Sequence, residues 1–168
     1  MTNIFTEENG YYALDCRAAL WASDSMHEEY GKTGNFLNDV DFIIEDEDYI
    51  YLVEYKNATI PGAVNPDGFQ PMSDKKIQNV CREFYDALHY LTILGKDKPK
   101  KYIYVLEYPN GDSASRRLLR NRIKLLLPFQ LQLGGNKLIE SVEVLSVSEW
   151  NASERYGNYP FCNVAELS

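Results

Sequence analysis

The sequence predicts one α/β domain in which a mixed central β-sheet is flanked by α-helices. Short runs rich in Ile, Val, Tyr and Phe alternate with longer segments whose apolar residues recur at helical spacing. Turn residues separate these two kinds of segment. A length of 168 residues, with 45% of them hydrophobic, suits a single domain spanning residues 1–168 with a sizeable core.

The first element predicted is a helix from Glu7 to about Glu29. Its apolar residues have helical spacing, and Gly31 and Gly34 follow it as breakers. A short strand is expected in the GNFL stretch that comes next. The apolar positions that define the helix are Tyr12, Leu14, Ala18, Leu20 and Trp21.

A β-hairpin is predicted next, from strands at about 39–44 and 49–56 that are joined by the acidic turn EDED. Side chains alternate between the two faces of a strand. If the turn contains an even number of residues, Asp41 therefore lies opposite Leu52 or Glu54 on the same face. The two carboxylates would then be direct or diagonal neighbours.

The second half of the chain predicts a helix, a strand, a second helix and a final strand. A loop rich in Pro and Gly, long enough to form a flap, leads to Ser73 or Asp74 as the cap of a helix over 75–94. That helix carries an apolar stripe and ends at Gly95. A strand at YIYVLEY, a basic helix over about 114–127 that Pro128 closes, and a strand over about 140–147 follow. The stripe consists of Ile77, Cys81, Phe84, Leu88 and Leu91.

Charge and targeting signals limit the function classes. The net charge of −8 argues against a protein that coats nucleic acid over its whole surface. Five cations lie within residues 116–124, which leaves −13 for the rest, so a local basic site remains open. The three cysteines suggest neither a disulfide framework nor structural zinc. The N-terminus has no signal-peptide pattern and no segment approaches about 18 apolar residues, so a cytoplasmic protein without membrane contact is expected.

The charged residues of the predicted hairpin indicate a cation site. Two carboxylates that share one face of an otherwise apolar pair of strands are costly to desolvate unless something compensates them. Mg²⁺ or Mn²⁺ would do so, because hard cations bind carboxylate and carbonyl oxygens and keep positions open for a phosphate. With Lys56 close by to orient or activate water, the chemistry that fits is phosphodiester hydrolysis.

At VDFII and VEYK the sequence resembles the PD-(D/E)xK nuclease superfamily, in particular its small resolvase-like and Mrr-like members with a restriction-endonuclease-like fold. The resemblance implies that Asp41 and Glu54 are metal ligands, that the carbonyl of Tyr55 is a third ligand and that Lys56 is catalytic. It covers about residues 7–108, and the helix and strand over about 112–150 would be additions. The residue before Asp41 is Val40, where many members have Pro.

The resemblance also implies auxiliary residues. Many members place a Glu of the first helix near the metal, and Glu8 is the candidate here, with Glu7, Glu28 and Glu29 as competitors. Some members place a Gln or a basic residue on the helix after the lysine. Three residues of this chain would serve in that role: Gln78, Lys75 and Lys76.

The basic helix has two interpretations. In one, its cations are the solvated face of a helix whose buried stripe is Leu119, Ile123 and Leu126. In the other, cations four residues apart follow a phosphate backbone. The residues in that second role are Arg116, Arg120 and Lys124, alongside Lys75 and Lys76 as further candidate contacts to nucleic acid.

The function expected is a Mg²⁺- or Mn²⁺-dependent nuclease that hydrolyses DNA, or else RNA, with a homodimer or a protein partner as open alternatives. A competing hypothesis is a catalytically inactive member of the same fold, whose acidic surface binds a protein partner or acts as an inhibitor. A third is a domain with no role in phosphodiester chemistry. The third gains weight if Asp41, Glu54 and Lys56 do not converge in space.

Overall fold

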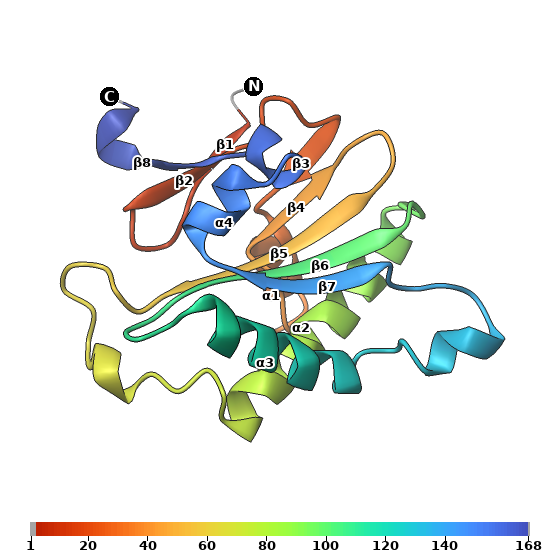
Figure 1. The fold of residues 1–168 in the computed structure, drawn as a ribbon. Helices are drawn as coiled ribbons and strands as arrows, with labels where there is room; N and C mark the ends of the chain where they lie inside the picture. The colour runs from red at the N-terminus through yellow and green to blue at the C-terminus, as the bar shows by residue number, and fades with distance from the viewer. Residues whose placement is uncertain (1–2, 168) are drawn as a thin grey trace.

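A computed structural model describes residues 3–167 of the chain, and Figure 1 shows its ribbon. Strands and helices alternate through most of the sequence, with short 3-10 turns in the loops. The elements are β1 (Ile4–Thr6), β2 (Tyr12–Asp15), β3 (Trp21–Ser23), α1 (Met26–Gly31), β4 (Phe42–Glu45), β5 (Ile50–Asn57), η1 (Pro66–Gly68), α2 (Asp74–Ile93), β6 (Lys100–Glu107), α3 (Ser113–Leu126), η2 (Leu131–Gly134), β7 (Ser141–Leu145), α4 (Val147–Ala152), η3 (Tyr156–Asn158), β8 (Phe161–Asn163) and η4 (Val164–Glu166).

The centre of the molecule is a mixed five-stranded sheet in the order β3-β4-β5-β6-β7. The strands β3, β4 and β5 are antiparallel neighbours, whereas β5, β6 and β7 run parallel. Parallel neighbours need a crossover connection, and α2 and α3 supply the two crossovers. Both helices lie on the same face of the sheet (Figure 1). The predicted mixed α/β sheet flanked by helices is thereby confirmed.

Two hydrophobic cores lie on opposite faces of this sheet. On the helical face, Leu52 and Tyr102 pack against residues of α2 and α3 such as Phe84 and Leu119. On the other face, Tyr51 and its neighbours pack against α4 and against a small antiparallel sheet in the order β1-β2-β8. Figure 1 shows these two layers above and below the central strands. The layers together form one compact domain.

The predicted hairpin is confirmed, and its register has the parity that the sequence analysis required. Phe42 pairs with Val53 and Glu45 pairs with Ile50, while the backbone of Asp46 bonds that of Tyr49. The pairing closes on an even number of loop residues. Continued by one residue beyond β4, this register places Asp41 opposite Glu54.

The two long helices are also confirmed, and each has a defined start. The Ser73 hydroxyl accepts a hydrogen bond from the Lys76 N–H and caps α2. Asp112 caps α3 and forms a capping box with Ser115. After α2 the backbone of Gly95 takes a left-handed conformation with φ of 69°, which favours glycine and ends the helix.

The N-terminal segment differs from the structure predicted from the sequence. The helix predicted from Glu7 to about Glu29 is wrong, because this stretch forms β2, β3 and, only from Met26, the short helix α1. Gly10, with φ of 76°, turns the chain between β1 and β2. The apolar residues of the segment serve two different sheets. The strand predicted in GNFL is also wrong, since those residues form turns and bends.

The C-terminal third completes both sheets. The final predicted strand is confirmed as β7, which pairs with β6 and therefore belongs to the central sheet. After it, α4 packs on the sheet and β8 pairs with β2, joining segments far apart in the sequence. Within residues 3–167, no helix has the length and apolar character needed to cross a membrane.

Candidate metal and nuclease site

The candidate site lies where β5 leaves the hairpin. Glu54 and Lys56 belong to β5 and share the face of the sheet that Leu52 presents to α2. Asp41 is the residue immediately before β4. The hairpin therefore brings the three residues of the predicted motif to the same end of two neighbouring strands.

The three side chains converge on one ammonium group. The Nζ atom of Lys56 lies 2.8 Å from Oε1 of Glu54 and 4.0 Å from Oδ2 of Asp41. The two carboxylates are thus near enough to share one cation, and here Lys56 is that cation. The predicted convergence is confirmed.

Glu54 is buried, with a residue exposure of 1%. Its Oε1 atom faces Lys56, but its Oε2 atom has no hydrogen-bond partner among the described residues. Burial raises the pKa of Glu54, and the nearby Asp41 and Glu83 carboxylates raise it further, against the opposing effect of Lys56. A buried carboxylate oxygen without a partner is costly, and a bound cation would remove that cost.

Glu83 is a further carboxylate of this cluster, and the sequence analysis missed it. It comes from α2, and its Oε2 atom is also buried without a hydrogen-bond partner. Burial raises the pKa of the Glu83 carboxyl to about 8, with Lys56 opposing the shift and Asp41 adding to it. A signal was present in the sequence, because Glu83 lies on the same helical row as Val80, Ala87 and Tyr90, which are buried.

The electrostatic balance of the cluster favours a cation. Burial raises the pKa of Asp41, although Lys56 and a hydrogen bond from the Tyr55 N–H oppose this effect. Burial works against the charged form of Lys56, yet the carboxylates of Glu54 and Asp41 raise the pKa of its ammonium. One positive charge therefore faces three carboxyl groups.

Tyr55 places a backbone carbonyl at the site. Its N–H donates to Oδ2 of Asp41 at 2.8 Å, next to the pair formed by Phe42, the first residue of β4, and Val53. The N–H and C=O of one strand residue point to the same side, so the Tyr55 carbonyl faces this edge too. The Tyr55 ring, in contrast, packs against Phe161 on the opposite face of the sheet.

A cavity of about 390 Å³ opens beside Asp41 and Lys56. Glu8 lines it from the turn between β1 and β2, so the predicted auxiliary Glu is at the cavity, although its first-helix setting is wrong. Glu7 also lines the cavity, but its carboxylate accepts hydrogen bonds from the Asn9, Tyr11 and Tyr12 N–H groups and holds the turn. The other charged or ionisable residues of the wall are Asp24, His27 and Asp39.

His27 and Asp39 form a pair on the outer wall of this cavity. Nδ1 of His27 lies 3.1 Å from Oδ2 of Asp39, and the histidine side chain is largely exposed. The competing candidates Glu28 and Glu29 are on α1, and neither lines the cavity. Among the four glutamates considered, Glu8 is therefore the best placed to face a ligand beside Asp41.

The auxiliary residues predicted on α2 lie outside the cavity. Gln78, Lys75 and Lys76 lie on exposed positions at the start of α2, and none of them lines the cavity. The Gln78 side chain accepts a hydrogen bond from Arg82, and the Lys76 ammonium lies 5.5 Å above the Phe69 ring. The helix contributes Glu83 to the cluster instead.

The basic helix α3 divides its cations between the interior and the surface. Arg116 is buried, donates from Nε to the Leu106 carbonyl and pairs with Glu107, so its predicted role as a phosphate contact is wrong. Arg120 and Lys124 remain on the outer side, with Lys124 over the Phe129 ring. The predicted buried stripe holds for Leu119 and Ile123 but not for Leu126, which is 46% exposed.

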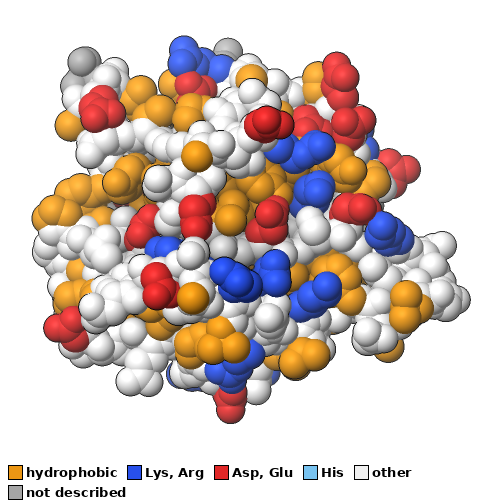
Figure 2. Space-filling model, viewed as in Figure 1, with side chains coloured by type: hydrophobic (Ala, Val, Ile, Leu, Met, Phe, Trp, Pro, Cys, Tyr) orange, Lys and Arg blue, Asp and Glu red, His pale blue; other side chains and the backbone are white. Residues whose placement is uncertain are grey.

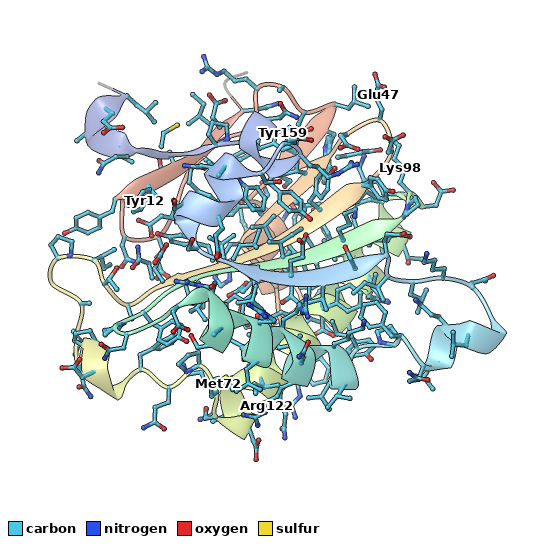
Figure 3. The ribbon with its side chains drawn as sticks, in the orientation of Figure 1. Tyr12, Glu47, Met72, Lys98, Arg122 and Tyr159 are labelled. Atoms are coloured by element: carbon cyan, nitrogen blue, oxygen red, sulfur yellow. The ribbon has the colours of Figure 1, made fainter. Side chains whose placement is uncertain are left out.

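Figure 2 shows Lys and Arg side chains gathered on the part of the surface that α3 occupies, with hydrophobic side chains beside them. Arg122 does not belong to the free basic surface. It donates to the Met72 carbonyl at 2.5 Å and pairs with Asp74 at 2.6 Å, which ties α3 to the start of α2 (Figure 3). The surface cations of α3 are therefore fewer than the sequence suggests.

The donor set fits a hard divalent cation. Two carboxylates and a backbone carbonyl are oxygen ligands of the kind that Mg²⁺ and Mn²⁺ accept, and water completes such sites. The unpartnered Oε2 of Glu54 is an available donor atom. In the part of the chain from 3 to 167, no three side chains of His, Cys, Asp or Glu are arranged to hold a metal ion together. The carbonyl and water would therefore have to supply the remaining ligands.

Comparisons with family models, with curated proteins and with solved structures find no match to this chain.

Proposed function

We propose that the protein is a metal-dependent nuclease that hydrolyses phosphodiester bonds, in DNA more than in RNA. The observation that carries the proposal is the convergence of Asp41 and the buried Glu54 on the Lys56 ammonium, with the second Glu54 oxygen left without a hydrogen-bond partner among residues 3–167. A carboxylate in that position is unfavourable unless it is used to bind a cation. The order of hairpin, helix and strand around the motif supports a restriction-endonuclease-like fold as part of the same proposal.

Each residue has a role in the proposed reaction. Asp41, Glu54 and the Tyr55 carbonyl would hold Mg²⁺ or Mn²⁺, which lowers the pKa of water and neutralises charge on the reacting phosphate. Lys56 lies beside both carboxylates, so its ammonium can orient the attacking water or stabilise the developing negative charge. Glu8 would hold water at the open side of the cavity.

The basic residues outside the cavity would bind the nucleic acid backbone. Arg120 and Lys124 on α3, and Lys75 and Lys76 on α2, lie on the surface and would contact phosphates without reading sequence. The acidic remainder of the chain would limit this contact to a local patch.

A second candidate function is a catalytically inactive module that binds a protein partner through its acidic surface. Two observations favour it: the ion pair between Lys56 and Glu54 already compensates one of the carboxylates, and the cavity wall is rich in acidic residues. A bound divalent cation is the feature that distinguishes the two functions.

The deciding experiment incubates plasmid and single-stranded DNA with the purified protein in Mn²⁺. The wild type and a Lys32→Ala control, which changes an exposed lysine directly after α1, should degrade the DNA, and Lys56→Ala should leave it intact. Cleavage by Lys56→Ala at the wild-type rate, or no cleavage by the wild type, would reject the nuclease proposal. The second outcome would favour the protein-binding module.

A further inference from the structure

A second cavity, of about 250 Å³, adjoins the candidate site. It lies between the end of β5 and the loop that carries η1, and it shares Asn9, Lys56 and Asn57 with the first cavity. A ligand could therefore extend from one cavity into the other past the Lys56 side chain.

The two cavities differ in charge. The first is lined by five carboxylate residues, including Glu8, Asp39 and Asp41. Among residues 3–167, no carboxylate lines the second, and Lys56 is its one charged residue. A ligand that spans both would place an anionic group that binds the proposed metal near Asp41. Its neutral part would lie against the loop.

The wall of the second cavity suits a flat, polar ring. Phe69 contributes a half-buried aromatic ring, and Ile60 and Val64 contribute apolar surface. The Asn65 side chain, at the start of η1, makes no capping hydrogen bond and none with another residue of 3–167, so its amide can donate to and accept from a ligand. An aromatic face beside an unused amide is a common means of holding an unpaired base.

A hydrogen bond from the N-terminal turn helps to hold the loop that forms this wall. The Tyr11 hydroxyl donates to the Pro61 carbonyl at 2.9 Å, which connects the loop to the turn that carries Glu8. The walls of the two cavities are thereby linked across the site.

We propose that the second cavity binds one unpaired nucleobase, stacked on Phe69 and hydrogen-bonded by Asn65, with the adjoining phosphate beside Lys56. This inference rests on the proposed nuclease function and narrows its substrate. A base that enters the cavity must leave its stack, so the substrate is nucleic acid with a single-stranded or unpaired nucleotide at the bond that is cut.

Binding of small probes tests the cavity without requiring catalysis. In Mg²⁺, nuclear magnetic resonance titrations would compare deoxyadenosine monophosphate with deoxyribose phosphate, which lacks the base. We expect the nucleotide to bind about ten-fold more tightly, because stacking one base contributes affinity of that order. The Asn65 side-chain amide should shift with the nucleotide and not with the sugar phosphate.

A matched pair of variants locates the effect. Phe69→Leu should abolish the advantage of the nucleotide, whereas Phe129→Leu should keep it, since Phe129 is also half-buried under a lysine but lies outside the cavity. Equal affinity for the two probes, an advantage that survives Phe69→Leu, or no binding at millimolar nucleotide would overturn the proposal. Base binding by a protein that fails to cut DNA would instead separate this cavity from the nuclease function.

Discussion

At the scale of single residues, the site is defined by an excess of carboxylates over cations. Asp41, Glu54 and Glu83 act on one another and on Lys56, whose ammonium is the one that pairs with the first two within the described residues 3–167. If this excess exists to bind a metal, removal of one negative charge relieves repulsion in the metal-free protein. If Glu54 instead forms a structural ion pair with Lys56, the same change leaves the Lys56 ammonium without its charged partner.

Glu54→Gln separates these two interpretations. We expect its free energy of unfolding in chelator to equal or exceed that of the wild type, while metal affinity and DNA cleavage are lost. Melting temperatures of the two proteins in chelator measure the first effect, and a clear loss of stability would remove the metal-site assignment.

Glu45→Gln is the matched control for that substitution. Glu45 pairs with Lys96 and Lys98, and its hydrogen bond from Lys96 lowers its pKa despite partial burial. The same change should therefore cost about 1–3 kcal/mol of stability at neutral pH, because it weakens hydrogen bonds between charged groups. Opposite signs for the two glutamates are the expected result.

The raised pKa of Glu83 predicts how the stability of the protein varies with pH. Burial raises its pKa from 4.5 to about 8, so between these values the folded chain binds more protons than the unfolded chain. The free energy of unfolding in chelator should therefore fall as the pH rises through this window, by roughly 2–4 kcal/mol. Denaturant titrations across the window measure the slope, which Glu83→Gln should reduce. An unchanged slope in that variant would show that Glu83 is not the responsible group.

Removing the Lys56 ammonium should strengthen metal binding but abolish catalysis. Its ammonium occupies the position between Glu54 and Asp41, so it competes with a metal ion for the same oxygens. Lys56→Met should abolish cleavage yet show a larger rise in melting temperature on addition of Mn²⁺ than the wild type. Lys32→Met, which changes a surface lysine paired with Glu29, should respond as the wild type does. A smaller rise in Lys56→Met would mean that the lysine assists metal binding.

The sequence was sufficient to predict that Asp41, Glu54 and Lys56 converge, because their positions depend on a local hairpin. Strand alternation and the parity of one short turn are enough to bring them together. Glu83 depends on how α2 packs across the sheet, which the apolar stripe chosen from the sequence did not reveal. That stripe is one of two adjacent buried rows on the helix, and Glu83 lies on the other.

At the scale of elements, the predictions that were confirmed concern segments set by local sequence, and those that were wrong concern segments set by distant pairing. The hairpin, α2, β6, α3 and β7 have strong local periodicity and clear caps, and all five were predicted. Residues 4–23 instead contain strands of three or four residues whose partners include β8 and β4. A spacing that resembles a helix then arises by chance, because the pairing that decides the structure is distant in sequence.

The two sides of α3 should respond differently to loss of charge. Arg116→Met removes a buried guanidinium that bonds the Leu106 carbonyl and Glu107, and should cost about 2–4 kcal/mol of stability. Replacing Arg120 and Lys124 together with Gln should leave stability nearly unchanged but weaken DNA binding and lower its salt dependence by about two counterions. Chemical denaturation and binding titrations at several salt concentrations measure these effects. If a stably folded Arg116→Met variant lost as much DNA affinity as the variant with Arg120 and Lys124 replaced, Arg116 would also contact DNA and this division of α3 would be wrong.

At the scale of the whole molecule, metal binding should stabilise the fold. A ligand that binds only the folded chain raises its stability in proportion to RT ln(1 + [L]/Kd). We expect millimolar Mg²⁺ or Mn²⁺ to raise the melting temperature of the wild type, and Asp41→Asn to abolish most of the shift. Scanning calorimetry with and without chelator tests this. A shift that persists in Asp41→Asn would place the ion elsewhere on this acidic protein.

The pairing of β2 with β8 ties the sheet next to the cavity to the last strand of residues 3–167. The turn that carries Glu8 lies between β1 and β2, and β2 is the middle strand of a small sheet whose other edge is β8. The hairpin with Asp41 and Glu54 leaves the ribosome early, whereas β8 follows every other strand. A nascent chain therefore carries the carboxylates long before the small sheet can fix the outer wall around them. If the protein is the proposed nuclease, such an order would delay its activity until translation has passed β8.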